Sequence, residues 1–215
     1  MKYKALFLDL DGTILDTLDD LTDSVNFALK NNGFAPRTKK EIRSFLGNGS
    51  TYLIKKAIPH EVDESVFEKV FKEYKTCYQN NCSIKTKPYD GVLKFLKNAK
   101  DNGLKLVMIT NKPQEIAEIL VDKYFENMFE LVYGQSSKIK TKPDPESINL
   151  AKKQLNLKNS EIFYIGDSLV DLKTAEISKL DYAIVAYGFA DKKDIIAAGA
   201  NNIVDRIDDI WKMIA

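Results

Sequence analysis

The chain has 215 residues, of which 44% are hydrophobic and 29% charged, a composition typical of a globular protein with a buried core. Its 32 basic and 31 acidic side chains leave a formal net charge of +1, which argues against a nucleic-acid-binding protein that depends on overall charge. No apolar run reaches the roughly 20 residues of a membrane helix, and the apolar stretch near the start is too short for a secretory signal. The two cysteines are too few for a zinc site. We therefore expect a cytoplasmic monomer or homodimer without nucleic-acid or membrane partners.

The first predicted elements in chain order are a short strand and a long helical region. Residues 4–8 are mostly apolar and end at an acidic, glycine-containing turn, as a buried strand does. From residue 17 to about residue 81, apolar residues recur at three- and four-residue spacing, which indicates amphipathic helices. The aromatic residues Phe67, Phe71 and Tyr74 follow this spacing and are expected in the core of the helical region.

From residue 88 onward, expected strands alternate with expected helices. The strands cover 105–109, 131–133, 162–165 and 182–186, and the helices cover 92–99, segments after Pro113 and Pro145, 169–177 and a final short pair. This alternation predicts a parallel sheet with helices on both faces. The predicted fold is α/β: a doubly wound, Rossmann-like core of residues 1–15 and 84–215, interrupted after its first strand by a helical domain of residues 16–83.

Polar residues follow the expected strands at the points where those strands end. Asp9, Asp11, Gly12 and Thr13 follow the first strand; the later clusters are Thr110 with Asn111, Lys142, and Asp167 with Asp171. Ligands of open parallel sheets bind beyond the carboxyl ends of the strands. The sequence therefore predicts one polar site at this edge of the sheet.

The carboxylates in these clusters predict a metal site. Asp9 and Asp11 are two residues apart, so an extended backbone points both to one side, and Asp167 arrives from a neighbouring strand. Gathered carboxylates repel one another unless a cation intervenes. Mg²⁺ is the expected ion because it prefers oxygen ligands.

The remaining groups suit a phosphate. Thr110 offers a hydroxyl, Lys142 a positive charge, and the backbone N–H groups near Gly12 can approach an anion closely. A carboxylate beside a metal-bound phosphoryl group can act as a nucleophile and form an aspartyl phosphate.

These clusters, in this order, resemble the signature of the haloacid dehalogenase superfamily. The run from Asp9 to Thr13 matches its first motif, Thr110 the second, Lys142 the third, and Gly166-Asp167 with Asp171 the fourth. The helical insertion at residues 16–83 matches the cap that the superfamily places after its first strand. The resemblance therefore covers the whole chain.

The resemblance implies the role of each site residue. Asp9 would be the nucleophile, and Asp11 would protonate the leaving alcohol and then deprotonate water, because phosphatases of the superfamily carry Asp at that position. The implied catalytic residues are Asp9, Asp11, Thr110 and Lys142, and the implied Mg²⁺ ligands are Asp9, Asp11, Asp167 and Asp171.

A narrower resemblance concerns the substrate. Gly47-Asn48-Gly49 after Arg43, the run from Thr110 to Pro113, and Tyr187-Gly188-Phe189 resemble phosphoglycolate phosphatases. Ser147 departs from that pattern, where a proline is usual. The resemblance implies a small phosphorylated metabolite, 2-phosphoglycolate, as substrate, with contacts from Gly12, Thr13, Arg43, Asn48 and Asn111. A pyrophosphatase, a phosphosugar mutase and a non-hydrolytic binding protein of the same fold remain alternatives.

Overall fold

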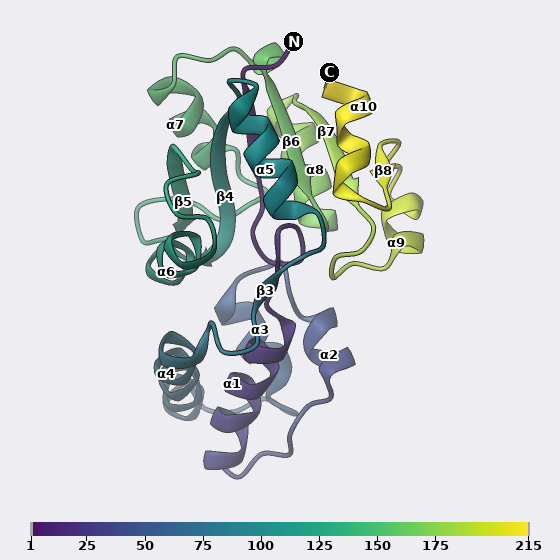
Figure 1. The fold of residues 1–215 in the computed structure, drawn as a ribbon. Helices are drawn as coiled ribbons and strands as arrows, with labels where there is room; N and C mark the ends of the chain where they lie inside the picture. The colour runs from purple at the N-terminus through teal and green to yellow at the C-terminus, as the bar shows by residue number, and fades with distance from the viewer. Residues whose placement is uncertain (1, 215) are drawn as a thin grey trace.

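A six-stranded parallel sheet forms the centre of the protein in the computed structural model, which describes residues 2–214 (Figure 1). The strand order is β5-β4-β1-β6-β7-β8, and every neighbouring pair is parallel. The strands are β1 (Ala5–Leu8), β4 (Lys105–Pro113), β5 (Leu131–Gln135), β6 (Ile162–Gly166), β7 (Asp181–Val185) and β8 (Ile203–Val204). The predicted parallel α/β architecture is confirmed.

Helices cover both faces of the sheet because side chains alternate between the faces along each strand. In β1, Leu6 and Leu8 pack into one apolar cluster, while Ala5 and Phe7 pack into another on the opposite face. Helices α5 (Val92–Asp101), α6 (Gln114–Tyr124) and α10 (Trp211–Ile214) contribute to the first cluster, and α7 (Glu146–Gln154) and α8 (Leu169–Ser178) contribute to the second. A short helix, α9 (Lys192–Ala197), precedes β8.

Two details of the sheet differ from the sequence prediction. Strand β4 continues four residues past Ile109 to Pro113, with an irregular register against β5, so its polar residues belong to the strand rather than to a loop. Strand β8 was not predicted, because two residues are too short to show a periodic pattern.

The inserted segment consists of four helices at the carboxyl edge of the sheet (Figure 1). They are α1 (Leu18–Asn31), α2 (Lys39–Ser44), α3 (Ser50–Ala57) and α4 (Glu64–Asn81). Helix α2 begins with a capping box between Thr38 and Glu41, and Gly33 follows α1 with a φ of +78°, which glycine adopts without strain. Within residues 2–214, no helix is long and apolar enough to cross a bilayer.

Two short strands connect the helical segment to the sheet domain. β2 (Leu15–Asp16) pairs antiparallel with β3 (Lys87–Pro88), so Asp16 belongs to a strand and not to the all-helical stretch that the sequence predicts. Asp20 in α1 fixes this connection: its carboxylate accepts hydrogen bonds from the backbone N–H groups of Lys85 (3.0 Å) and Thr86 (2.9 Å). The division into a core and a cap at residues 15/16 and 83/84 stays a prediction.

Candidate active site

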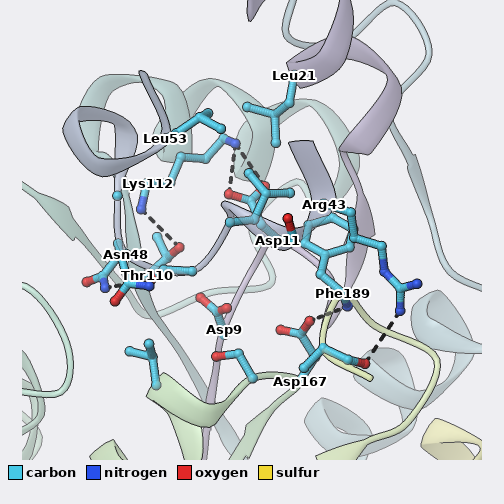
Figure 2. Close-up of a pocket in the computed structure, with 18 of the residues that line it drawn as sticks. Asp9, Asp11, Leu21, Arg43, Asn48, Leu53, Thr110, Lys112, Asp167 and Phe189 are labelled. Atoms are coloured by element: carbon cyan, nitrogen blue, oxygen red, sulfur yellow. Dashed lines mark hydrogen bonds and ion pairs between the residues drawn. The ribbon is translucent and has the colours of Figure 1, made fainter. Parts of the chain in front are cut away.

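The polar residues at the strand ends line one cavity between the sheet edge and the helical segment (Figure 2). The cavity has a volume of about 360 Å³, room for roughly a dozen water molecules at ~30 Å³ each. Asp9, Thr110, Lys142 and Asp167 line it from the sheet side. The strand ends are thus brought together as the sequence predicts.

Lys142 lies between two carboxylates at the floor of this cavity. Its Nζ atom is 2.8 Å from Oδ1 of Asp9 and 2.7 Å from Oδ1 of Asp171. Burial alone would lower the pKa of Lys142, but Asp171 and Asp9 outweigh burial and raise it. Burial would likewise raise the pKa of Asp171, yet the ammonium of Lys142 and hydrogen bonds from Ser168 and Tyr164 hold it below its usual value. Both shifts favour the charged forms of Lys142 and Asp171.

The pKa values of Asp9 and Asp167 are raised, in contrast to that of Asp171, which is lowered. Burial raises the pKa of Asp9 to about 7, and the charge of Asp171 adds to this effect while Lys142 opposes it. Burial, followed by the charges of Asp171 and Asp9, also raises the pKa of Asp167 well above its usual value. A backbone N–H donated by Phe189 (2.6 Å) only partly offsets this rise. A further positive charge nearby would therefore stabilise the ionised forms of both carboxylates.

A divalent cation fits this environment. Carboxylate oxygens of Asp9, Asp167 and Asp171 lie within 4.8 Å of one another, and hard oxygen ligands suit Mg²⁺. Four carboxylates (Asp9, Asp11, Asp167 and Asp171) face two ammonium groups (Lys112 and Lys142), which leaves a formal charge of −2 when all are ionised.

The acidic cluster is held by close packing and by hydrogen bonds. A Cβ atom added to Gly12 or Gly188 would collide with the Asp167 side chain, so only glycine fits at these positions. The oxygens of Asp171 already accept hydrogen bonds from Tyr164, Ser168 and Lys142. Asp9 and Asp167 therefore have more capacity left to bind a metal than Asp171.

The carboxylate of Asp11 lies outside this cluster, although the sequence predicts it as a metal ligand. Both of its oxygens accept hydrogen bonds from Nζ of Lys112, at 2.8 and 3.0 Å, and Oδ1 also accepts one from Thr17 at 2.6 Å. The buried ammonium of Lys112 attracts the Asp11 side chain toward the helical segment and away from Asp167. Asp11 nevertheless lines the cavity, where a proton donor can reach a bound ester.

Thr13 and Asn111, which are expected to contact substrate, have internal partners, while Thr110 is an expected catalytic residue. Thr13 donates a hydrogen bond to Oδ1 of Asp167 at 3.2 Å, so its hydroxyl orients a candidate metal ligand. Thr110 is buried and lines the cavity. The side-chain amide of Asn111 donates to the carbonyl oxygens of Gly47 (3.0 Å) and Lys142 (3.1 Å).

The cap residues expected to contact substrate, Arg43 and Asn48, both line the cavity. Arg43 donates a hydrogen bond to the carbonyl oxygen of Gly188 at 3.0 Å and lies 3.6 Å from Asp191. It therefore connects the helical segment to the loop beside Asp167. Asn48 lies in the loop before α3, at the cavity wall (Figure 2).

Sequence reasoning included Lys112 in the run from Thr110 to Pro113 but gave it no role in the site. It did not identify Tyr78, and it assigned Tyr74 to the cap core alone. Both tyrosines are buried in α4 and line the cavity, and Nζ of Lys112 donates to the hydroxyl of Tyr78 at 2.6 Å. The four-residue spacing of the tyrosines places them on one helix face, which is the signal that could have indicated a shared surface. The contact between Tyr78 and Lys112 depends on how the helical segment packs against the sheet edge.

Comparison with known proteins identifies the family. The family model for haloacid dehalogenase-like hydrolases matches residues 6–185. The chain belongs to this family of hydrolases, as the motifs at the strand ends predict.

Named relatives are phosphatases. The chain is 32% identical to a phosphoglycolate phosphatase of Colwellia psychrerythraea, covering 96% of this chain and 95% of that protein. It is 30% identical to an N-acetylmuramic acid 6-phosphate phosphatase of Pseudomonas aeruginosa, covering 95% and 92%. The structure of a predicted phosphoglycolate phosphatase from Haemophilus somnus superposes with a TM-score of 0.94 at 25% identity, covering 100% and 99%. The expected enzyme class, a phosphoric monoester hydrolase, is confirmed.

Proposed function

We propose that this protein is a Mg²⁺-dependent phosphatase that hydrolyses a small phosphate monoester, 2-phosphoglycolate, through an aspartyl phosphate on Asp9. The observation that carries the proposal is the position of Asp9. Its carboxylate lies at the cavity floor, 2.8 Å from the ammonium of Lys142, and within the acidic cluster that suits a divalent cation. The nucleophile therefore lies beside the positive charge of Lys142, and Mg²⁺ held by the acidic cluster would supply a second positive charge to hold the phosphoryl group.

The reaction has two steps. A carboxylate oxygen of Asp9 attacks phosphorus, the ester P–O bond breaks, and Asp11 gives a proton to the departing alcohol oxygen. A water molecule then attacks the same phosphorus while Asp11 takes its proton. The bond between Asp9 and phosphorus breaks, and inorganic phosphate is released.

Lys142 and Thr110 would bind the phosphoryl oxygens from the sheet side. Asp9 and Asp167 would hold Mg²⁺, and Asp171 would support the site by fixing Lys142 at 2.7 Å. The ion would supply positive charge that neutralises the phosphate and stabilises the transition state. Thr13 would keep the Asp167 carboxylate in its orientation through the hydrogen bond between them.

The helical segment, residues 16–83, would act as a cap domain over a core of residues 1–15 and 84–215. It lines the cavity with Asn48, Tyr74 and Leu53, and closure of this cap would exclude bulk water from the phosphoryl group. A cavity of about 360 Å³ favours a small metabolite over a phosphoprotein. The free thiols of Cys77 and Cys82 support a reducing, cytoplasmic location.

N-acetylmuramic acid 6-phosphate is a second candidate substrate. The relative that carries this name is 30% identical, which is close to the 32% of the phosphoglycolate phosphatase. A pyrophosphatase or a phosphosugar mutase would use the same nucleophile. The mutase differs in releasing no free phosphate.

The experiment is a panel of phosphate esters assayed for released phosphate, with Mg²⁺ and with excess chelator. The panel contains 2-phosphoglycolate, N-acetylmuramic acid 6-phosphate, glucose 1-phosphate and pyrophosphate. We expect 2-phosphoglycolate to give the highest kcat/KM, with activity lost in chelator and restored by Mg²⁺. Full activity in chelator, or no phosphate released from any ester, would refute the proposal. Size-exclusion chromatography with light scattering distinguishes monomer from homodimer.

A further inference from the structure

Four cationic side chains line the cavity, and they differ in their partners and in their exposure. Lys142 pairs with Asp9 and Asp171 on the phosphate side. Arg43 binds the carbonyl oxygen of Gly188, and Lys40 is an exposed residue of α2. The fourth cation, Lys112, is the one that remains to be explained.

Lys112 is buried to a degree that is unusual for a lysine. Its side chain is 2% exposed, and burying an ammonium group is costly unless it is paired. Its Nζ atom donates to both oxygens of Asp11, at 2.8 and 3.0 Å (Figure 2). The same ammonium group donates to the hydroxyl of Tyr78 at 2.6 Å. The same atom lies 4.7 Å from the centre of the Tyr78 ring. The pocket around Lys112 is therefore built to hold a carboxylate against an ammonium group.

The position of this pocket relative to the reaction follows from the chemistry of the substrate. Asp11 is the proposed proton donor to the ester oxygen, so that oxygen must come within hydrogen-bond reach of Asp11. In an ester such as 2-phosphoglycolate, the carboxylate is attached to the same carbon as the ester oxygen. A carboxylate at that position comes next to Asp11, which is where Lys112 lies. The carboxylate of N-acetylmuramic acid 6-phosphate is on a different part of the sugar.

We propose that Lys112, assisted by the hydroxyl of Tyr78, binds the substrate carboxylate and selects phosphate esters that carry a carboxylate on the ester-bearing carbon. This inference rests on the proposed phosphatase function and names the residues that choose its substrate. The substrate carboxylate accepts hydrogen bonds that Lys112 donates to Asp11 when no substrate is bound. Asp11 is then free to turn toward the ester oxygen. Binding of the correct substrate and placement of the proton donor are thus linked through one ammonium group.

The test compares two esters that differ in the carboxylate. 2-Phosphoglycolate and ethyl phosphate share the carbon chain and the phosphate, so the ratio of their kcat/KM values measures recognition of the carboxylate. We expect the Lys112→Met variant to lose about 30-fold or more of this ratio, because removing one partner of a buried charge pair is costly. The loss should come mainly from KM and kcat/KM for 2-phosphoglycolate. Lys112→Arg keeps the charge and should retain part of the ratio, and Tyr78→Phe should lose a smaller part of it.

A second measurement keeps the test independent of turnover and of folding defects. Calorimetry with the Asp9→Asn variant compares binding of 2-phosphoglycolate and ethyl phosphate directly. Adding Lys112→Met to an Asp11→Asn background removes both partners of the buried ion pair, which leaves no unpaired charge, and should abolish the preference for the carboxylate in binding.

The outcomes separate the two proposals. Equal losses on both esters in Lys112→Met, or a wild-type enzyme without preference for the carboxylate, would overturn the role of Lys112 while leaving the phosphatase function intact. An enzyme that releases no phosphate from any ester would refute the proposed function. In that case, the binding ratio would still decide whether Lys112 recognises a carboxylate.

Discussion

Asn111 of the sheet donates a hydrogen bond from its side-chain amide to the carbonyl oxygen of Gly47 in the helical cap, with 3.0 Å between the two atoms. Its side-chain oxygen accepts a hydrogen bond from the backbone N–H of Lys142 at 2.7 Å. One buried side chain thus joins the cap, the sheet edge and the loop of the phosphate-binding lysine. Asn111 is therefore placed as a structural connection. It also lines the cavity, and its predicted substrate contact stays a prediction.

The first prediction is that Asn111→Ala lowers the free energy of unfolding by about 1–3 kcal/mol, because the buried N–H of Lys142 loses its partner. Urea denaturation measures this change. Asn102→Ala is the matched control, since the exposed Asn102 amide donates to Asn98 within one helix end. The control should change stability by no more than about 0.5 kcal/mol. Equal effects of the two substitutions would contradict the connecting role.

The second prediction separates backbone strain from crowding of the metal site. Gly12 and Gly103 have φ values of +82° and +79°, so replacing either by alanine should cost about 1 kcal/mol of stability. A Cβ at Gly12 collides with the Asp167 carboxylate, whereas a Cβ at Gly103 meets nothing within 4 Å. Of the two substitutions, we expect only Gly12→Ala to weaken Mg²⁺-dependent activity. The loss should be about 100-fold or more, the size expected when a catalytic group is displaced. Similar activity losses in both variants would contradict the conclusion that close packing at Gly12 positions the Asp167 carboxylate.

The third prediction concerns pH and Mg²⁺. The pKa of Asp9 is raised to about 7 and that of Asp167 is raised well above its usual value, against about 3.9 in the unfolded chain. The metal-free folded protein therefore binds these protons more tightly than the unfolded chain. It loses stability as pH rises from about 4 through 7 and above.

Because Mg²⁺ binds the ionised carboxylates, its stabilising effect should increase over the same range. Melting temperatures with chelator and with Mg²⁺, at pH 5.5 and pH 8, test this directly. The Mg²⁺-induced rise should be larger at pH 8, and Asp167→Asn should abolish most of it. A rise of the same size at both pH values would count against the cluster as the metal site.

The fourth prediction concerns the proton donor. Asp11→Asn should lower kcat by about 10²–10⁴-fold on an alkyl ester, because the leaving alkoxide then has no acid to protonate it. On p-nitrophenyl phosphate, whose leaving group needs no proton, formation of the phosphoenzyme should survive while its hydrolysis slows. Rapid-quench kinetics would then show a burst of nitrophenol. A variant without a burst, and with equal losses on both esters, would mean that Asp11 does not act as the acid.

Much of the fold and part of the site could be predicted because they depend on local patterns. The buried run before Asp9 identifies a central strand, and strand ends that share one edge bring Asp9, Lys142 and Asp167 together. The contact between Lys112 and Tyr78 could not be predicted, because it joins the sheet to the cap across 34 positions of the chain. The orientation of the Asp11 carboxylate away from the metal cluster could not be predicted either, because Lys112 comes next to Asp11 only in the folded molecule.

The most direct test of the central claim is to look for phosphate bound covalently to Asp9. Wild-type protein and the Asp9→Asn variant are quenched during turnover of 2-phosphoglycolate with Mg²⁺ and reduced with tritiated borohydride, which converts an aspartyl phosphate to labelled homoserine and releases the phosphate. The labelled residue is then located by peptide mapping. The covalent mechanism predicts label on Asp9 in the wild type and none in the Asp9→Asn variant. Phosphate release at a near-normal rate by the Asp9→Asn variant, with no labelled peptide in the wild type, would contradict it.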